Sequence, residues 1–196
     1  LDKVIRVADV RDGEIMFGLN MVVHKGKTIF VGDTSVHEYP TSEQMAEIAI
    51  STARVVRLFG FEPKVAFVSH STFGQPLTSR TKHIRKAVDI LKEKKVDFEF
   101  DGDMQPDVAL NPEYKELYPF SKLVGNANIL IMPGQHSAAI SYKMMKTLGD
   151  TKVIGPLLIG LGLPVEIAPL RSSTSEIINL ASIAAYSADV IKYIKW

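Results

Sequence analysis

The fold is decided by the stretch Lys64-Val65-Ala66-Phe67-Val68-Ser69, which is followed by His70-Ser71-Thr72-Phe73-Gly74-Gln75-Pro76. A short, continuous apolar run that ends in a hydroxyl-rich turn is typical of a parallel strand buried on both faces. Helical patterns flank it over residues 41–59 and 80–94. We therefore predict that this strand is central in an open α/β sheet, where ligands bind at the carboxyl ends of the strands.

The composition is that of an ordinary globular protein. The 196 residues are 46% hydrophobic, which is enough for one sizeable core or two small ones. The net charge of +1 and the scattered basic residues give no electrostatic signature for nucleic acid or a membrane surface. No apolar run approaches the roughly 20 residues of a membrane helix. Without cysteine, disulfides and thiolate chemistry are excluded.

The N-terminal part predicts an antiparallel hairpin. Strand-like residues occupy 4–7 and 14–23, and a polar turn over residues 24–27 leads into a strand at 28–31. The chain begins at Leu1 without a signal-peptide pattern, which we interpret as the start of a piece cut from a longer chain.

The helices carry recognisable start and stop signals. Thr41 and Gln44 form a capping-box pattern at the first helix, and Gly60 is expected to end it. For the second helix, Ser79 and Thr81 are the candidate caps. A terminal helix is predicted to begin in the hydroxyl-rich run at residues 172–176 and to continue to about Ile194. Its predicted buried face consists of Ile177, Leu180, Ala181, Ala184 and Ala185.

Further strands are predicted over residues 97–100, 127–132 and 164–168. Asp101-Gly102-Asp103 is interpreted as a turn, because Asp and Gly are common in turns. Residues 153–160 are rich in Gly and Pro and are expected to bring the backbone close to a ligand or another strand.

Three hydroxyl-rich turns follow predicted strands and are the candidate ligand sites. If their strands are parallel and adjacent, all three face one crevice, where helix N–H groups and hydroxyls suit a phosphate or pyrophosphate. The alternative is that these side chains only cap helices. The candidate contacts are Ser69, Ser71, Thr72, His136, Ser137, Arg171, Ser172, Ser173 and Glu176.

Catalytic and metal sites have weaker support. His70 or His136 could act as a base beside a serine, but a structural hydrogen bond is the more common role of such a pair. We predict no metal site, since no His-x-x-x-His or paired-carboxylate spacing occurs on a helix. There is no Gly-x-Gly-x-x-Gly or Walker-type loop for a nucleotide.

Several longer segments resemble the phosphotransacetylases, the phosphate acetyl/butyryl transferase family. The similarity runs through nearly the whole chain in order. It is carried by residues 33–41 and 43–49, by Asn128-Ile129-Leu130-Ile131-Met132-Pro133, by Ile140-Ser141-Tyr142-Lys143, by residues 154–161 and by Glu176-Ile177-Ile178-Asn179.

Other segments are more similar to one branch, the transferase-like C-terminal region of bacterial NADP-dependent malic enzymes. These are residues 69–76, residues 96–104 and Leu117-Tyr118-Pro119-Phe120. The resemblance implies a three-layer, mostly parallel sheet with an antiparallel hairpin, in the two-part fold of phosphotransacetylases and isocitrate dehydrogenases. It also implies that the N-terminal part of that fold is missing here, that residues 1–165 form an α/β domain, and that residues 166–196 return to the other domain.

The active family carries a Ser-Arg pair and, six residues after the Arg, an Asp. Aligned through Pro164-Val165, these positions hold Pro169, Leu170 and Glu176. Proline and leucine side chains cannot donate a hydrogen bond or positive charge to a phosphoryl group. The resemblance therefore implies a domain without catalytic residues, although Arg171 lies one position along and offers an alternative cation.

The resemblance implies a cytoplasmic regulatory and oligomerising domain of a malic enzyme, with acetyl-CoA as effector. Its expected partners are an acyl-CoA or acyl phosphate, a second copy in a dimer or higher homo-oligomer, and the malic-enzyme domain of the same chain. This domain would hold no cofactor, and NADP and a divalent metal would bind upstream. Two alternatives stay open: an active phosphate acetyltransferase, and a purely structural dimerisation domain.

Overall fold

A computed structural model describes residue 4 and residues 6–191. Over this part of the chain, helices and strands alternate in the α/β order that the sequence predicts. In chain order the elements are β1 (Phe17–His24), β2 (Lys27–Gly32), α2 (Ser42–Leu58), β3 (Lys64–Val68), α3 (Ser79–Lys94), β4 (Glu99–Met104), α4 (Pro106–Leu110), η1 (Pro112–Leu117), β5 (Ile129–Ile131), α5 (Gln135–Leu148), β6 (Thr151–Ile159), β7 (Val165–Glu166) and α6 (Thr174–Ile191).

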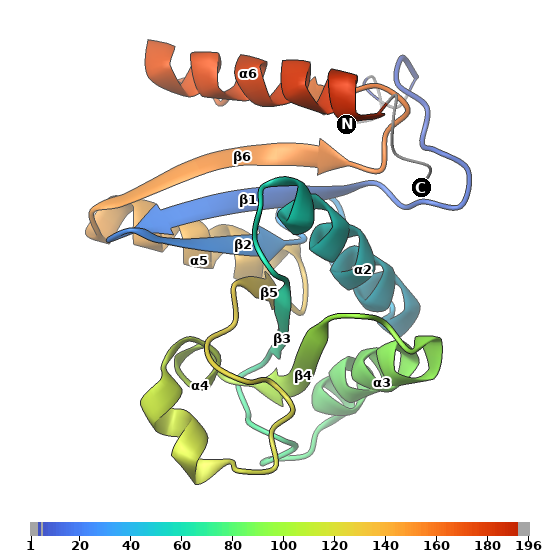
Figure 1. Cartoon of the computed structure of the whole chain (residues 1–196), viewed down its shortest axis with the longest axis vertical. Helices are drawn as coiled ribbons and strands as arrows, with labels where there is room; N and C mark the ends of the chain where they lie inside the picture. The colour runs from blue at the N-terminus through green and yellow to red at the C-terminus, as the bar shows by residue number, and fades with distance from the viewer. Residues whose placement is uncertain (1–3, 5, 192–196) are drawn as a thin grey trace.

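Within the described residues, the strands form one sheet in the order β4-β3-β5-β2-β1-β6-β7 (Figure 1). β4, β3, β5, β2 and β6 point in one direction, and β1 and β7 run against them. The predicted mostly parallel sheet with an antiparallel hairpin is confirmed. β3 has a parallel neighbour on each side, but β2, and not β3, is the middle strand of the sheet.

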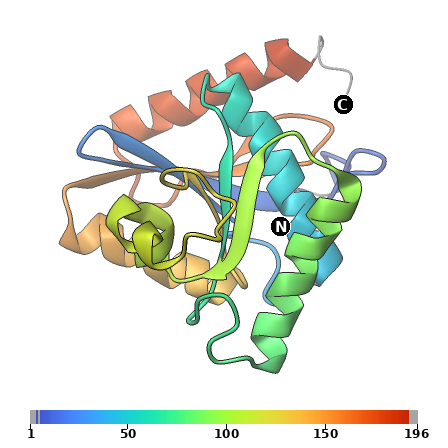
Figure 2. The same ribbon diagram turned by 60° about the horizontal axis from the view of Figure 1, so that its bottom comes forward.

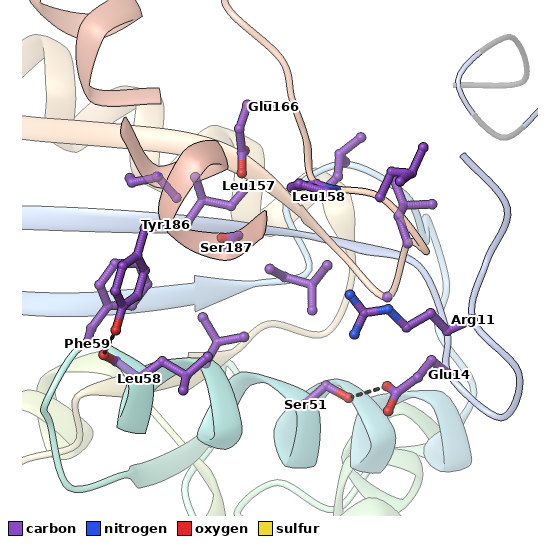
Figure 3. Close-up of a pocket in the computed structure, with 17 residues that line it drawn as sticks. Arg11, Glu14, Ser51, Leu58, Phe59, Leu157, Leu158, Glu166, Tyr186 and Ser187 are labelled. Atoms are coloured by element: carbon purple, nitrogen blue, oxygen red, sulfur yellow. Dashed lines mark hydrogen bonds between the residues drawn. The ribbon is translucent and has the colours of Figure 1, made fainter. Parts of the chain in front are cut away.

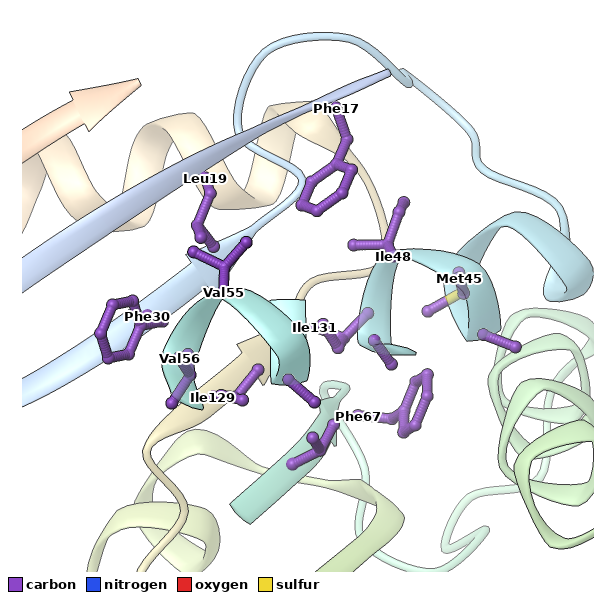
Figure 4. Packing of buried hydrophobic residues seen from close by; sticks show 14 of the residues in the cluster. Phe17, Leu19, Phe30, Met45, Ile48, Val55, Val56, Phe67, Ile129 and Ile131 are labelled. Carbon is purple, nitrogen blue, oxygen red and sulfur yellow. The ribbon is translucent and has the colours of Figure 1, made fainter. Parts of the chain in front are cut away.

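Helices cover both faces of the sheet, which gives three layers. α2 and α3 lie side by side on one face, α6 packs on the same face beside β6, and α4, η1 and α5 cover the other face (Figures 1 and 2). Alternate strand residues supply the core under α2 (Figure 4). The largest of these buried side chains are Phe17, Leu19, Phe30, Phe67, Ile129 and Ile131.

α2 has the start, the buried face and the end that the sequence predicts. Thr41 accepts a hydrogen bond from the Gln44 amide, and the Gln44 side chain accepts one from the Thr41 amide. The helix buries Met45, Ile48 and further residues at helical spacing. It ends before Gly60, which has φ +82° and donates its amide to the Arg57 carbonyl.

The hairpin is confirmed, but its boundaries differ from the prediction. Lys25 and Gly26 have φ of 47° and 76°, as a tight two-residue turn between twisted strands requires. The strand predicted at residues 4–7 is wrong for residues 4, 6 and 7, which the structure describes. The Val7 and Ala8 amides both donate to the Val4 carbonyl, which makes a turn, and residue 5 lies outside the described residues.

Asp101-Gly102-Asp103 is not a turn but part of the edge strand β4. Gly102 has φ +151°, and a side chain there would meet Phe67 at 2.8 Å, so only glycine fits beside β3. Asp101 accepts hydrogen bonds from the Ser121 hydroxyl and the Lys122 amide, and Asp103 accepts from the loop after β3. The two carboxylates can be buried in a strand because neighbouring loops donate to them.

Two other expectations can be compared with the structure. α3 is capped by Thr78, with Thr81 as its reciprocal partner, and not by Ser79 or Thr81. A side chain on Gly155 would meet the Leu19 carbonyl at 2.8 Å, so the expected close approach to another strand is confirmed.

The predicted buried face of α6 is largely wrong. Leu180 is buried and Ala184 is half-buried, whereas Ile177, Ala181 and Ala185 are exposed. The last predicted helical residues, 192–194, lie outside the described residues.

Candidate functional site

The carboxyl ends of β2, β3 and β5 lie at one edge of the sheet, because these strands are parallel. The first two hydroxyl-rich turns, at Ser69–Thr72 and His136–Ser137, therefore share that edge. β7 runs in the opposite direction. The third turn, at Arg171–Ser173, consequently follows the other edge, and the expectation of one crevice for all three turns is wrong.

Ser71 and Asp103 form the most buried polar pair at the first edge. The Ser71 hydroxyl donates to Asp103 Oδ2 over 2.6 Å, and the Gly74 amide donates to the same oxygen over 3.3 Å. Asp103 is fully buried, and its Oδ1 has no hydrogen-bond partner among the described residues. The sequence analysis assigned no role to Asp103, because the Asp-Gly-Asp pattern resembles a turn. The apolar Met104 that follows was a weak sign that the strand continues.

The remaining side chains of this turn also bond within the protein. Ser69 Oγ lies 3.4 Å from Ser71 Oγ, and Thr72 Oγ1 accepts a hydrogen bond from the Gln105 amide. The side-chain amide of Gln105 donates to the His70 carbonyl. A phosphate at Ser71 would lie close to the Asp103 carboxylate, which opposes an anion. Ligand binding by Ser69, Ser71 and Thr72 stays a prediction.

Asp33 organises the neighbouring loop after β2. Its buried carboxylate accepts hydrogen bonds from the Gly18, Ser35 and His37 amides and lies 2.7 Å from His37 Nδ1. Burial by itself would raise the pKa of Asp33, but the His37 ring and the backbone donors outweigh it, and the pKa is lowered. The carboxylate therefore fixes the path of the loop.

His136 and Ser137 lie in the first turn of α5, beside this loop. His136 Nε2 lies 3.5 Å from Glu38 Oε1, and both side chains are mostly exposed. The Ser137 hydroxyl donates to the Gly134 carbonyl over 2.8 Å. A Gly134 side chain would collide with the Glu38 carbonyl, so this junction requires a residue without one. Substrate contacts of His136 and Ser137 stay predictions.

At the opposite edge, a small pocket lies where the α5 C-terminus meets the α6 N-terminus. Lys146 Nζ pairs with Glu176 Oε1 over 2.8 Å, and Ser172 contributes a buried hydroxyl without a partner among the described residues. Sequence reasoning did not single out Lys146 or Tyr142, because a pocket between two distant helix ends has no local signature. The lining residues are Tyr142, Lys146, Val153, Ile154, Gly155, Pro156, Pro169, Ser172, Glu176 and Leu180.

Ser173 and Glu176 cap α6. The Ser173 amide and hydroxyl both donate to Glu176 Oε2, and the Glu176 amide donates to Ser173 Oγ. The Lys146 ammonium and the Ser173 donors lower the pKa of Glu176 to about 2. Glu176 is therefore a carboxylate at neutral pH and a weak base.

The described residues contain no group of three or more His, Cys, Asp or Glu side chains placed to hold a metal ion. None of the helices in this part of the chain is both long and apolar enough to cross a membrane.

The sequence pattern of the phosphate acetyl/butaryl transferases matches residues 1–185. The chain belongs to that family. Solved phosphotransacetylases agree with this transferase fold. The enzyme from Streptococcus pyogenes superposes with a TM-score of 0.89 at 30% identity, over 96% of this chain and 59% of that one. The EutD phosphotransacetylase from Staphylococcus aureus gives 0.85 at 28% identity, over 94% and 58%.

Curated relatives of this transferase-family chain include malic enzymes and phosphate acetyltransferases. The NADP-dependent malic enzyme of Rhizobium meliloti (strain 1021) is 47% identical over 188 residues, which are 96% of this chain and 25% of the relative. The phosphate acetyltransferase of Bacillus subtilis (strain 168) is 34% identical over 169 residues, 85% of this chain and 52% of the relative. The chain thus spans about a quarter of the malic enzyme and about half of the transferase.

Proposed function

We propose that this chain is a transferase-family domain that has lost acyl transfer and acts as a regulatory and assembly domain of an NADP-dependent malic enzyme. The similarity to malic enzymes over almost the whole chain, and over only a quarter of their length, supports such a role within a larger protein. NADP and a divalent metal would then bind in the rest of that protein, in the cytoplasm. This domain would contribute ligand sensing and contacts between copies.

The loss of catalysis is supported by one observation above the others. At the two positions where the family resemblance expects a Ser-Arg pair, the chain has Pro169 and Leu170. Both are exposed, and the Leu170 side chain is as exposed as in an extended peptide. Neither side chain can hydrogen-bond or stabilise the negative charge that develops on a phosphoryl group.

The third aligned position, Glu176, is also unsuited to catalysis. A general base works best with a pKa near the working pH, whereas the pKa of Glu176 is about 2. Both of its oxygens are already engaged, one by Lys146 and one by Ser173. The position that holds an Asp in the active family therefore serves here to cap α6 and to tie it to α5.

Acetyl-CoA is the proposed effector, and the pocket at the start of α6 is the proposed place for it. Ser172 offers a buried hydroxyl, Lys146 a cation, and Arg171 a second, exposed cation nearby. Such groups suit the phosphates of coenzyme A. For a ligand here to change malate turnover, it must bind one arrangement of the subunits better than another.

The test follows thermal unfolding of the intact protein and malate-dependent NADPH formation in the same samples, with and without acetyl-CoA. At about 100 times its Kd, a ligand adds about 2.7 kcal/mol to the free energy of unfolding. We expect a higher Tm and a changed rate, both lost in Arg171→Ala and in Ser172→Ala and both kept in Lys82→Ala, which removes an exposed cation on α3. If acetyl-CoA changes neither quantity in the unmodified protein, the sensing role is wrong and a purely structural dimerisation domain becomes the better account.

One feature favours a second function, an active phosphate acetyltransferase. Arg171 is exposed one position after Leu170 and could place a guanidinium near an acyl phosphate. Turnover of acetyl phosphate with coenzyme A, present in the unmodified protein and abolished by Arg171→Ala, would establish transfer and refute the loss of catalysis. We expect no such turnover, because Leu170 and Arg171 lie in a turn closed by a hydrogen bond from the Ser172 amide to the Pro169 carbonyl, and successive side chains of a turn point in different directions.

A further inference from the structure

Three aromatic rings meet at the end of the molecule opposite α6, where the loop after β3 lies beside the segment that follows η1 (Figure 1). The Phe73 ring packs against Tyr118 and Phe120, with centroid distances of 5.5 and 4.9 Å. Phe73 and Tyr118 are partly buried against the core beneath them, whereas Phe120 is 64% exposed. We call these three rings, together with Leu77 and Leu117 beside them, the aromatic patch.

The two leucines widen this apolar surface. Leu117 is 69% exposed at the end of η1, and Leu77 is 55% exposed in the loop between β3 and α3. A side chain on Gly74 would meet Leu77 Cδ1 at 3.3 Å, so Leu77 lies against the turn that carries Phe73. Single exposed apolar residues are common, but a group of them gathered at one place marks a contact site for another molecule.

The loop presents the Phe73 ring in a strained backbone conformation. Phe73 has φ +50°, in the left-handed region that a bulky side chain rarely adopts. Its amide donates to the Asp103 carbonyl over 2.7 Å. The Gly74 amide and the Ser71 hydroxyl donate to the carboxylate of the same residue. Such strain persists only where the surroundings impose it, and it is common at functional positions.

The segments around the patch share a similarity to one branch of the family. Residues 69–76, 96–104 and 117–120 are the three segments that resemble malic enzymes more than stand-alone transferases. In the structure, β4 lies in the second of these segments and joins the other two. Asp103 accepts from the loop after β3, and Asp101 accepts from the two residues that follow the third segment. Segments far apart in the sequence thus build one branch-specific surface.

We propose that the aromatic patch is the surface on which the malic-enzyme part of the intact protein docks, a role that rests on the proposed function. The chain covers 25% of its Rhizobium meliloti malic-enzyme relative, so most of such a protein lies outside it. A contact between two transferase-like copies would be useful in both branches, whereas this surface has the sequence of the malic-enzyme branch. The occupant is therefore the part that only malic enzymes possess.

The composition of the patch defines the surface that fits it. None of its five residues is charged, and two of its three ring pairs meet edge to face. Rings held in this way offer a rigid apolar surface, as the centres of stable protein interfaces do. The docked surface of the malic-enzyme part should accordingly be apolar where it meets Phe120 and Leu117.

The patch is distinct from the pockets of the chain. A second pocket lies between α6, α2 and β6, with Arg11 and Glu166 among its lining residues (Figure 3). Neither this pocket nor the one at the start of α6 contains a residue of the aromatic patch. A protein docked on the patch therefore leaves the proposed acetyl-CoA pocket open. Effector and responding domain then bind at separate places, as allosteric regulation requires.

Photo-cross-linking of the intact protein tests the contact. The photoreactive residue p-benzoylphenylalanine replaces Leu117, whose exposure leaves the core undisturbed. After irradiation, mass spectrometry should identify cross-linked peptides from the malic-enzyme part. The same probe at Leu148, which is 80% exposed on α5 and lies outside the patch, should not give those peptides. Cross-links confined to residues 1–196, no cross-links from Leu117, or the same peptides from both positions would each overturn the proposal.

A second arm asks whether the contact passes on the response to acetyl-CoA. Leu117→Asp and Phe120→Asp each place a charge in the proposed contact, and Leu148→Asp is the matched control. We expect acetyl-CoA to raise the Tm of all three variants, because its pocket is unchanged. It should alter malate-dependent NADPH formation in Leu148→Asp but not in the two patch variants. A full rate response in both patch variants would contradict a docked malic-enzyme part.

Failure of this contact and failure of the proposed function give different results. If acetyl-CoA changes neither the Tm nor the rate of the unmodified protein, acetyl-CoA sensing is wrong, and the cross-links from Leu117 alone decide the docking surface. If acetyl-CoA acts as expected but Leu117 gives no cross-link to the malic-enzyme part, the sensing role stands and the docking surface is wrong.

Discussion

The Ser71 hydroxyl donates a 2.6 Å hydrogen bond to the Asp103 carboxylate, and both residues are almost completely buried. The bond joins the loop after β3 to the end of the edge strand β4. The Phe73 amide adds a second link by donating to the Asp103 carbonyl over 2.7 Å. Asp103 therefore holds the loop in which sequence reasoning expected a phosphate, and it occupies the hydroxyl that such a phosphate would need.

Replacing Asp103 by Asn tests this anchoring role. An Asn side chain keeps one acceptor oxygen but introduces an NH₂ group that needs its own acceptors in a buried place. We expect a loss of about 1–3 kcal/mol in the free energy of unfolding, measured with urea. Asp89→Asn breaks an exposed ion pair with Lys92 and should cost less than about 1 kcal/mol. Equal effects of the two substitutions would show that the buried carboxylate has no special role.

The cap of α3 gives a prediction with a neighbouring control. Thr78→Ala removes the hydroxyl that accepts from the Thr81 amide and should lower the free energy of unfolding by about 1 kcal/mol. Ser79 is the first helical residue, and Ser79→Ala should change stability by only a few tenths of that amount. Urea unfolding of the two variants decides the matter, and a larger loss for Ser79→Ala would support the cap predicted from the sequence alone.

Local signals in the sequence were sufficient where short-range chemistry sets the structure. The capping box of Thr41 and Gln44, the stop at Gly60 and the buried strand at residues 64–68 each depend on residues a few positions apart. The second half of β4, Asp101 to Met104, was missed because its two carboxylates accept hydrogen bonds from loops far away in sequence.

The candidate sites were harder to predict for the same reason. Whether the three hydroxyl-rich turns share one crevice depends on the directions of the strands that precede them, which the sequence does not show. β7 is antiparallel to its neighbour β6, so the third turn lies elsewhere. The pocket around Lys146 joins residues 30 positions apart, and the pocket around Arg11 and Glu166 joins the N-terminal segment to α2, β7 and α6. Such sites come from topology, and hydrophobic periodicity does not encode them.

The packing of α6 provides a third prediction. Leu180 is 5% exposed, whereas Ile177 on the same helix is 50% exposed, although the sequence pattern placed both on the buried face. Leu180→Ala should therefore cost about 2–5 kcal/mol by leaving a cavity. Ile177→Ala should cost about 1 kcal/mol or less, because much of that side chain already contacts water. If thermal unfolding shows the larger loss for Ile177→Ala, the face that α6 presents to β6 is different from the one described.

The ionisation of Glu166 predicts how stability depends on pH. The pKa of Glu166 is about 8 in the folded protein and near 4.5 when the side chain is free in water. Between these values the folded protein keeps a proton that the unfolded chain releases, so stability falls as pH rises. The contribution is complete below about pH 4.5 and is lost by the time the pH passes 8. Its size is on the order of a few kcal/mol.

Urea unfolding at intervals from pH 5 to pH 9 measures this loss, and Glu166→Gln provides the matched variant. Gln has nearly the same shape but no proton to release, so its stability should stay flat across the range in which the unmodified protein weakens. The carboxylates with lowered pKa values, Asp33 and Glu176 among them, titrate below this window and leave it undisturbed. Parallel curves for the two proteins would mean that Glu166 ionises as freely in the folded chain as in water, and burial would then not keep its carboxyl group protonated at neutral pH.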